Sequence, residues 1–330
     1  FECAPMYEEI NLAIDHNQLL LNLMDQVAIR HDFKVLSHEK PYADINGSGK
    51  HNNWSLITNT GINLLAPGKT PKNNLMFLTF FVNVIRAVYE HADLLRAAIA
   101  TASNDHRLGA NEAPPAIISI FLGSQLNAVL DEVETARVAK KVKAESQLWH
   151  GIPKIPTLQL DNTDRNRTSP FAFTGNKFEF RAVGSSANSA SPMTVLNAIV
   201  ADQLIQFKIE VDKQIKKGIK KDLALLNVVR KYIKDSKAIR FEGNGYSKEW
   251  EDEAAKRGLS NIKTTPRALD VYVTEKTEKL FESLGVLNKR EGEARHEILL
   301  ENYFKKIQIE ARVIGEIVNS MIVPVAITYQ

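Results

Sequence analysis

The stretch Phe171-Ala-Phe-Thr-Gly-Asn-Lys-Phe-Glu-Phe-Arg-Ala-Val183 carries the clearest structural pattern in the chain. Apolar and polar side chains alternate around Thr174-Gly175-Asn176, a tripeptide typical of a tight turn. We therefore expect a β-hairpin over residues 171–183. Successive side chains on a strand point to opposite faces, so Lys177, Glu179 and Arg181 would project together while the phenylalanines between them enter a core.

Two interpretations of this polar row stay open. A cation, a carboxylate and a cation on one face of a strand are common as a solvent-facing ion-pair ladder. The same three groups could instead hold a metal ion between two anion-binding side chains. Spacing alone slightly favours the ladder.

The pattern of the chain changes near residue 200. Before this point, polar loops and short strand candidates at 33–36 and 54–65 alternate with helical stretches at 6–31, 73–100 and 116–148. After it, charged helical segments are expected at 193–217, 221–238, 246–257, 267–283 and 290–321. We therefore expect a division into residues 1–200 and 201–330.

Composition narrows the class of protein. The 330 residues are 44% hydrophobic and 25% charged, an ordinary globular mixture. The net charge of +3 predicts no nucleic-acid partner, and the basic stretch from Lys213 to Lys221 is interpreted as a solvated helix face. No apolar run approaches the ~18 residues of a membrane span, which predicts no membrane partner. Cys3 is the only cysteine, which excludes an internal disulfide and fits a reducing cytoplasm.

Polar side chains crowd against glycines in the segment from Asn46 to Ser55. Its Gly47-Ser-Gly-Lys50 run does not fit a phosphate-binding P-loop. That motif requires a glycine where Asp44 stands and a serine or threonine where His51 stands.

Oxygen and nitrogen donors are scattered along the chain as Glu2, His51 and Glu179. Such a donor set would suit magnesium or manganese better than a thiol-rich zinc site. Spacing alone cannot assemble these residues, and each taken singly has the pattern of a surface residue.

Taken together, these segments resemble the glutamine synthetase family. Asn46-Gly-Ser-Gly-Lys-His51 is similar to the family signature Asn-Gly-Ser-Gly-x-His, and Lys177-Phe-Glu-Phe-Arg181 to its (Arg/Lys)-x-Glu-x-Arg segment. Asn166-Arg-Thr-Ser169 lies between them and is similar to the family's Asn-Arg-Ser segment. The spacing from Glu2 to Asn46 also matches that between a metal-binding glutamate and the Asn-Gly pair.

Further segments resemble the type III subfamily in particular. They extend through most of the chain and comprise His38-Glu-Lys-Pro41, Lys50-His-Asn-Asn-Trp-Ser-Leu56, residues 104–115, residues 170–177, Phe241-Glu-Gly-Asn-Gly-Tyr246 and Glu301-Asn-Tyr303.

The resemblance implies an α+β fold in which a curved, mainly antiparallel sheet is flanked by helices and followed by a helical C-terminal tail. Residues 1–200 would form the main part of the catalytic domain, and residues 201–330 the helical type III region. Because the chain starts at Phe1 without an initiator Met, we expect a fragment that lacks the N-terminal part of the protein.

The resemblance also assigns roles to individual residues. Metal ligands would be Glu2, His51 and Glu179. Glutamate would be bound by Asn46, Gly47, Arg107 and Arg181. Glu112 would cover the intermediate and help to form the ammonium site, Arg107 and Arg167 would act at the reacting groups, and ATP would contact Asn53, Ser55, Lys177 and Arg167.

Some positions depart from the type I pattern of the family. Asn53 stands where type I enzymes have a histidine beside the nucleotide, and Ala172 stands where they have a phosphate-binding arginine. The segment between Arg107 and Glu112 is one residue shorter than in type I. The ATP contacts and the flap geometry are therefore expected to differ.

The activity implied is that of a glutamate–ammonia ligase that uses ATP with Mg²⁺ or Mn²⁺ and proceeds through γ-glutamyl phosphate. A cytoplasmic, ring-based homo-oligomer, a dodecamer in the intact protein, is implied with it. Two alternatives stay open: a γ-glutamyl-polyamine ligase of the same fold and a non-enzymatic assembly relative. We expect the chain alone to be inactive.

Overall fold

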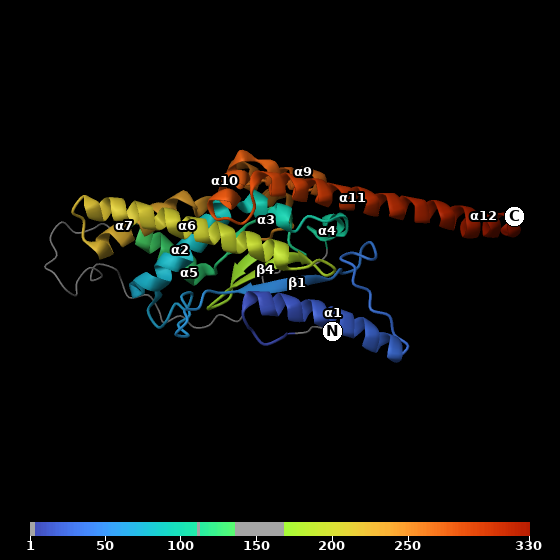
Figure 1. Ribbon diagram of the computed structural model, residues 1–330, viewed down its shortest axis with the longest axis horizontal. Coiled ribbons are helices and arrows are strands. Elements are labelled where there is room, and N and C mark those ends of the chain that lie inside the picture. Colours follow the sequence, from blue (N-terminus) through green and yellow to red (C-terminus); the bar gives the residue numbers. More distant parts are fainter. Residues whose placement is uncertain (1–3, 111–112, 136–167) are drawn as a thin grey trace.

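A small mixed sheet lies at the centre of the computed structural model, which describes residues 4–110, 113–135 and 168–330 (Figure 1). Its strand order is β1-β4-β3-β2. β1 (Gly49–Trp54) pairs antiparallel with β4 (Phe178–Gly184), β4 pairs antiparallel with β3 (Phe171–Phe173), and β3 pairs parallel with β2 (Ile120–Phe121). The α+β class, the mainly antiparallel sheet and the hairpin predicted over residues 171–183 are thus confirmed.

One face of this sheet is covered with phenylalanines. Phe171 and Phe178 stack with their ring centroids 4.9 Å apart, and Phe81 of α2 (Leu75–Glu90) meets Phe173 at 4.8 Å. Phe178 and Phe180 are fully buried, as the alternation predicts. Two further helices, α6 (Ala190–Lys216) and α7 (Lys221–Asp235), pack against α2 and complete the helical layer over this face (Figure 1).

The single helix expected over residues 73–100 is two helices. After a short 3-10 turn (Pro71–Asn73), α2 ends at Glu90, and α3 (Ala92–Ala98) continues at an angle of 75°. His91 is both the C-cap of α2 and the N-cap of α3. Hydrophobic periodicity passes through the bend because both helices bury apolar faces in the same core.

Other local predictions were wrong. Residues 33–36 form no strand, and residues 55–65 contain only an isolated bridge between Ile57 and Asn63. The polar segment between the helices expected at 73–100 and 116–148 begins with a helix, α4 (Ala102–Arg107). The helix expected from residue 116 is preceded by β2 and begins only at α5 (Ser124–Thr135).

The helices after residue 217 follow the predicted order, beginning with α7, except that the single helix expected over residues 267–283 is two helices separated by a 3-10 turn. After α7 come α8 (Lys248–Lys256), α9 (Thr265–Leu269), α10 (Glu275–Ser283) and α11 (Lys289–Ile317), with 3-10 turns at Lys237–Ile239 and Asp270–Val273. The expected boundary near residue 200 falls inside α6. The division at that point stays a prediction.

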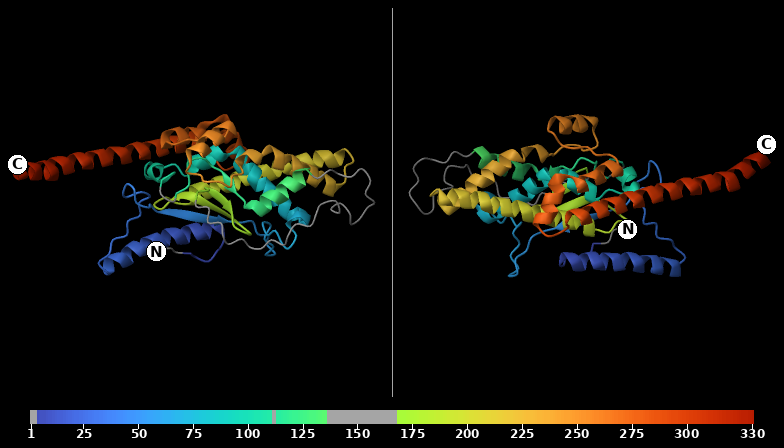
Figure 2. Two further views of the ribbon diagram at one scale, coloured as in Figure 1. Left: turned by 180° about the vertical axis from the view of Figure 1, so that it is seen from behind. Right: turned by 45° about the horizontal axis from the view of Figure 1, so that its top comes forward.

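The C-terminal helix extends away from the body (Figures 1 and 2). α11 begins with a capping box between Asn288 and Glu291, and it passes through a π-helical turn (Val318–Ile322) into α12 (Val323–Tyr329). By length and composition, the helix Lys289–Tyr329 is apolar enough to cross a membrane, and its apolar window is unburied. The sequence prediction overlooked this window because polar residues such as Glu316 interrupt the apolar run.

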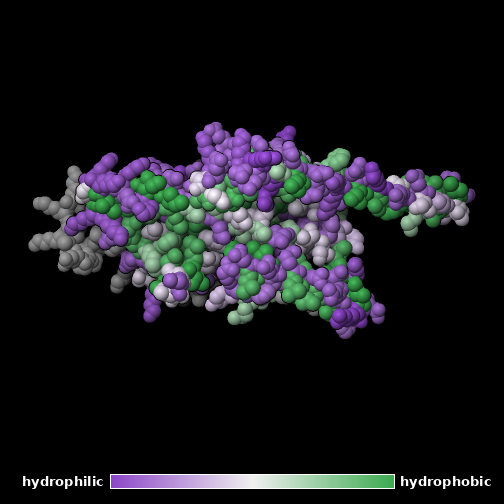
Figure 3. Space-filling view, viewed as in Figure 1, coloured by the Kyte–Doolittle hydropathy of each residue, from purple (hydrophilic) through white to green (hydrophobic). Residues whose placement is uncertain are grey.

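Apolar side chains are also exposed along this helix (Figure 3). Phe304, Ile314 and Met321 are each about three-fifths exposed, at 62%, 62% and 61%. They alternate around the helix with charged residues such as Lys305 and Arg312, which gives it an amphipathic character.

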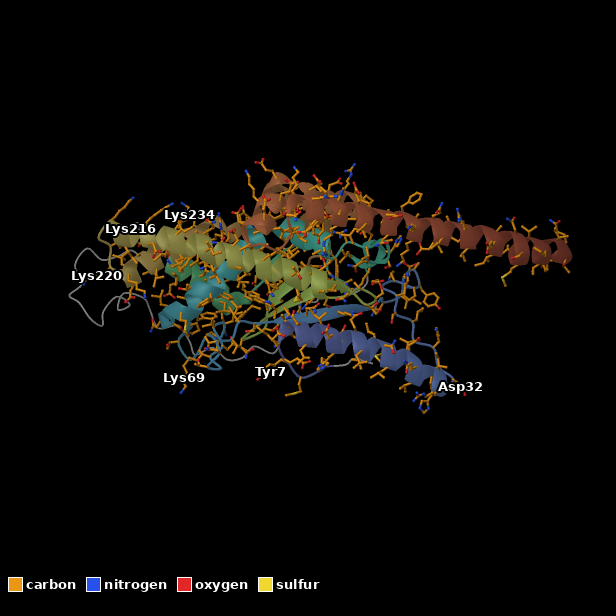
Figure 4. The ribbon with its side chains drawn as sticks, in the orientation of Figure 1. Tyr7, Asp32, Lys69, Lys216, Lys220 and Lys234 are labelled. Carbon is orange, nitrogen blue, oxygen red and sulfur yellow. The ribbon has the colours of Figure 1, made fainter. Side chains whose placement is uncertain are left out.

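The other face of the sheet is approached by α1 (Ile10–Arg30), which lies beneath β1 in Figure 1 and contains no buried residue. Tyr7 and Asp32, labelled in Figure 4, mark the two ends of this helix. Its first turn packs on the core through Ile10 and Ile14. Far from it, Lys216 and Lys220 are exposed near the end of α6, as the solvated helix face predicts (Figure 4).

Candidate active site

A wide groove opens between α1 and the sheet. It is lined by α1, by the segment from Asn46 to Ile57, and by the side chains of Arg107, Glu179 and Arg181. The groove therefore joins segments that are far apart in the sequence. Most of the described residues that the resemblance assigns to a site lie along it.

Glu179 is held between His51 and Arg181 on the groove face of β4. The Nδ1 atom of His51 lies 2.8 Å from Oε1, and an Arg181 guanidinium nitrogen lies 2.8 Å from Oε2. Burial alone would raise the pKa of the Glu179 carboxyl, but hydrogen bonds from His51 and Arg181 outweigh it and lower the pKa to about 2. Glu179 is therefore ionised throughout the physiological pH range.

The pairing of β1 with β4 explains how His51 reaches this carboxylate. Asn53 lies opposite Glu179 in the register, and the register shifts between Lys50 and Asn52. Bulges of this kind re-aim side chains at the edge of a sheet. His51 stands at the irregularity, and its side chain is 48% exposed, so its ring remains accessible from the groove.

Arg107 lies deeper, at the end of α4, and is only 5% exposed. Its guanidinium donates to the carbonyl of Arg181 at 3.2 Å, and to the carbonyl of Val183 and Oδ1 of Asn104 at 3.4 Å each. A Cβ at Gly49 would overlap this guanidinium. Glycine at the start of β1 thus allows Arg107 to pack directly against the strand.

Asn46 and Gly47 lie in the loop that precedes β1, on the same groove as Arg107 and Arg181. Lys40 donates to the carbonyl of Ile45, which ties this loop back to the segment before it. The structure thus brings together the four residues predicted to bind glutamate.

The residues predicted to contact ATP are more dispersed. Asn53 and Ser55 line the groove, and the Ser55 hydroxyl lies 3.0 Å from Oδ1 of Asn63 and 3.0 Å from the carbonyl of Asn176. Lys177 lies at the hairpin tip, outside the groove lining, where its carbonyl accepts from the Thr174 amide at 2.9 Å. Ala172 pairs with Glu179 and is fully buried, so no side chain reaches the groove there.

Three predicted site residues, Glu2, Glu112 and Arg167, lie outside the described residues. Within the described ranges, no group of three or more His, Cys, Asp or Glu side chains is placed to hold a metal ion. His51 and Glu179 are a pair of donors of the types that magnesium and manganese accept. They fit part of a coordination shell that needs further ligands.

Two carboxylates near the site were not predicted. Glu39 is fully buried behind the Asn46 loop. Glu242 lines the groove, where its Oε1 accepts from the amides of Leu122 at 3.3 Å and Gly123 at 3.1 Å. Both belong to segments that resemble type III enzymes, but neither position has a periodic or spacing signal that would indicate a role.

Two family models match parts of the chain. The family model described as "Glutamine synthetase, catalytic domain" matches residues 1–119, and that described as "Glutamine synthetase C-terminal domain" matches residues 224–330. A Bacteroides fragilis (strain YCH46) protein named "Glutamine synthetase" is 55% identical over 332 residues, which cover 100% of this chain and 46% of that protein. A "Type-3 glutamine synthetase" of Dictyostelium discoideum is 45% identical over 330 residues, covering 100% of this chain and 45% of that protein.

The chain thus spans about half the length of the curated relatives it matches. Solved structures share its fold at low identity. One titled "GmaS/ADP complex-Conformation 1" is 16% identical, with a TM-score of 0.54 over 92% of this chain and 53% of that one. Another, "Apo GmaS without ligand", has a TM-score of 0.52 at 16% identity and covers 90% of this chain and 51% of that chain. The two matched domains, together with relatives that align along the whole chain, show that it belongs to the glutamine synthetase family.

Proposed function

We propose that the protein containing this chain is a type III glutamine synthetase, a glutamate–ammonia ligase that forms glutamine from L-glutamate, ammonia and ATP. The observation that carries the proposal is the arrangement of His51, Glu179, Arg181 and Arg107 on one groove, beside the Asn46–Gly47 loop. Because the chain spans about half of its relatives, the activity is proposed for the whole protein.

The chemistry must overcome a poor leaving group, because a carboxylate does not expel an oxide or hydroxide. An oxygen of the glutamate γ-carboxylate attacks the γ-phosphorus of ATP, and the bond from that phosphorus to ADP breaks. Ammonia then attacks the γ-carbon of γ-glutamyl phosphate, inorganic phosphate leaves, and the nitrogen loses a proton. Both steps need charge to be dispersed over oxygens that positioned cations contact.

Arg107 and Arg181 are the cations that the described residues supply for glutamate. Arg107 is buried and fixed by backbone carbonyls, so it would bind a carboxylate with little loss of side-chain entropy. Arg181 is oriented by Glu179, and its guanidinium can present further N–H donors to a substrate oxygen. Asn46 and Gly47 would complete the glutamate site from the loop above.

Magnesium or manganese fits the donor pair of His51 and Glu179, and Glu2 is the further ligand that the family resemblance implies. When bound, the divalent ion supplies charge neutralisation at the phosphate oxygens. The low pKa of Glu179 keeps its carboxylate ready to bind such an ion at neutral pH.

The remaining roles follow the resemblance. Asn53, Ser55, Lys177 and Arg167 would contact ATP. Glu112 would bind ammonium and exclude water from the acyl phosphate, which hydrolyses readily. We propose in addition that the intact protein is a cytoplasmic, ring-based dodecamer that takes part in nitrogen assimilation. We propose for it neither nucleic-acid nor membrane partners. The 330 residues alone are proposed to be inactive.

The test uses the full-length protein. Glutamate-dependent ADP formation is measured with ammonia, hydroxylamine and putrescine in turn, in magnesium and in manganese. Activity with ammonia and hydroxylamine but not putrescine supports glutamine synthetase. Activity with putrescine alone assigns the protein to the polyamine ligases, and a folded oligomer without turnover assigns it to the non-enzymatic relatives.

A further inference from the structure

A fully buried carboxylate, Glu39, lies directly behind the loop that carries Asn46 and Gly47. It has an exposed fraction of 0%. Its Oε1 accepts from the amide of Ser186 at 2.9 Å and from the Ser186 hydroxyl at 2.7 Å. Its own carbonyl accepts from the amide of Ser48 at 2.9 Å. Glu39 therefore joins the substrate loop to the turn that follows β4.

Two glycines leave the space that Glu39 occupies. A Cβ at Gly47 would overlap the carbonyl oxygen of Glu39, and a Cβ at Gly184 would overlap its carboxylate. The hydroxyl of Ser48 adds hydrogen bonds to the His38 carbonyl at 2.9 Å and to the Ser185 hydroxyl at 2.8 Å. The loop and the end of β4 are thus closed tightly over one side chain.

Gly49 and Gly184 lie opposite each other in the β1–β4 pairing; a Cβ on Gly49 would meet the Arg107 guanidinium, and a Cβ on Gly184 would meet the Glu39 carboxylate. The carboxylate and the guanidinium therefore approach the same face of the sheet side by side. Burial lowers the pKa of the Arg107 guanidinium, and the nearby Glu39 carboxylate is the main group that raises it again. The same balance of burial and Glu39 holds at the Lys50 ammonium, whose pKa is lowered on balance. The hydrogen bonds of Arg107 go to neutral oxygens, so Glu39 supplies negative charge that these acceptors lack. A buried cation without an opposing charge is strongly destabilised.

A hydrogen bond from the C-terminal helix reaches the same place. Lys306 of α11 donates to the hydroxyl of Ser103 at 3.1 Å, and Ser103 is 2% exposed. Burial alone would raise the pKa of Glu39, and the neighbouring hydroxyls of Ser103 and Ser186 lower it below its usual value. The type III helix thus contacts α4 at Ser103.

We infer that Glu39 is a positioning residue for glutamate binding: its buried carboxylate fixes Arg107 and the Asn46–Gly49 loop in the geometry that receives the substrate carboxylates. The inference rests on the proposed function, because it assigns Glu39 to the glutamate half of that site.

The decisive variant is Glu39→Gln in the full-length protein. Glutamine has the same shape and can still accept from Ser186, but it lacks the charge opposite Arg107. We expect the KM for glutamate to rise at least about ten-fold, because the loss of one charge-assisted contact weakens binding by about that factor. The KM for ATP should stay within about two-fold of the unaltered protein, because Glu39 contacts the Asn46–Gly49 loop and Ser186, and distant sites without shared partners act almost independently.

A matched control is Asp32→Asn, which removes one carboxylate upstream of the same segment. Asp32 is exposed and has a φ of 58°, a conformation that asparagine adopts readily. Both Michaelis constants should be unchanged in this variant. An unchanged KM for glutamate in folded Glu39→Gln, or equal rises for glutamate and ATP, would overturn the inference.

If Glu39→Gln does not fold, Ser186→Ala replaces it, because it keeps the charge and removes one donor to Oε1. A selective rise in the KM for glutamate supports the inference, and no rise overturns it. Stabilisation of the unaltered protein by glutamate in thermal unfolding gives a second readout. If the unaltered protein shows no turnover, the proposed function fails. Loss of the glutamate-induced stabilisation in the same variants still supports the role of Glu39. Unchanged stabilisation in these variants overturns that role.

Discussion

The Nδ1 atom of His51 lies 2.8 Å from Oε1 of Glu179, although the two residues are 128 positions apart in the sequence. The contact crosses from β1 to β4, and Arg181 holds the other oxygen of the same carboxylate. The imidazole and the carboxylate are both of the ligand types that magnesium and manganese accept.

We expect Glu179→Gln to weaken the use of magnesium or manganese. The amide is close in shape but carries no charge, and it leaves Arg181 without its ionic partner. Loss of one such group costs about 10–100-fold in metal affinity or activity. The measurement is the rate of ADP formation by the full-length protein as the metal concentration is varied. Glu253→Gln removes a half-exposed carboxylate of α8 that is also paired with an arginine, Arg257, and it is the control. An unaltered metal dependence in Glu179→Gln would rule out its role as a ligand.

A second prediction concerns Ala172, the position at which type I enzymes have an arginine. Ala172 is fully buried and pairs with Glu179 in the sheet. The substitution Ala172→Arg should therefore disrupt the sheet and not restore a phosphate contact. Overpacking costs about 1–3 kcal/mol, and the new guanidinium would compete with His51 and Arg181 for the Glu179 carboxylate opposite it. Thermal unfolding of the variant is expected to begin several degrees lower, with no fall in the KM for ATP. A stable variant with a lower KM for ATP would show that the groove has room for the arginine.

The fold was predictable where the pattern was local. The alternation in residues 171–183 requires only neighbouring side chains, and it correctly placed Phe178 and Phe180 in the core. The bend at His91 could not be seen, because α2 and α3 present continuous apolar faces to one core. β1 was also hidden, since its polar side chains face a groove and lack the apolar alternation of an ordinary strand.

The site was predictable only in part. Residues alone left Glu179 open to either an ion-pair ladder or a metal site, and the structure shows its ion pair with Arg181 and its contact with His51. The family resemblance identified the residues that the sheet brings together. Glu39 could not be found in this way, because its burial depends on Ser186, which is 147 positions away.

The aromatic cluster beneath the site gives a prediction about stability. Phe178 is fully buried and contacts the rings of Phe81, Phe171 and Phe173 at centroid distances of 5.7, 4.9 and 5.1 Å. Phe178→Ala should lower the free energy of unfolding by about 3–5 kcal/mol, through lost burial and the cavity that remains. Denaturant unfolding measures this change.

Phe33→Ala is the matched control for that variant, because Phe33 is 74% exposed. It should change the free energy of unfolding by no more than about 0.5 kcal/mol. Equal losses in the two variants would contradict the placement of Phe178 in the core. Glu179 and Arg181 lie on the opposite face of the same strand, so we also expect Phe178→Ala to reduce activity at temperatures where the protein remains folded.

The last prediction concerns pH and the bend between α2 and α3. Burial, with a smaller contribution from the nearby Lys276 ammonium, lowers the pKa of His91 to about 4. In the unfolded chain its pKa is about 6.5. Between these values the unfolded state binds a proton that the folded state does not, so stability is full above about pH 6.5 and falls as the pH drops towards 4. The loss attributable to His91 reaches at most about 3 kcal/mol.

His91→Phe should remove this part of the pH dependence, because the ring is kept and the titrating group is lost. The Nδ1 atom is buried without a hydrogen-bond partner among the described residues, so the change breaks no hydrogen bond at that atom. The measurement is the thermal unfolding midpoint of the full-length protein at about pH 7.5 and pH 5, and the gap between the two should narrow in His91→Phe. The exposed His31→Asn serves as the control and should keep the gap of the unaltered protein. An equal difference between the two midpoints in His91→Phe and in the unaltered protein would contradict the prediction. It would show that His91 has the same pKa in the folded protein and in the unfolded chain, and so is not buried at the bend.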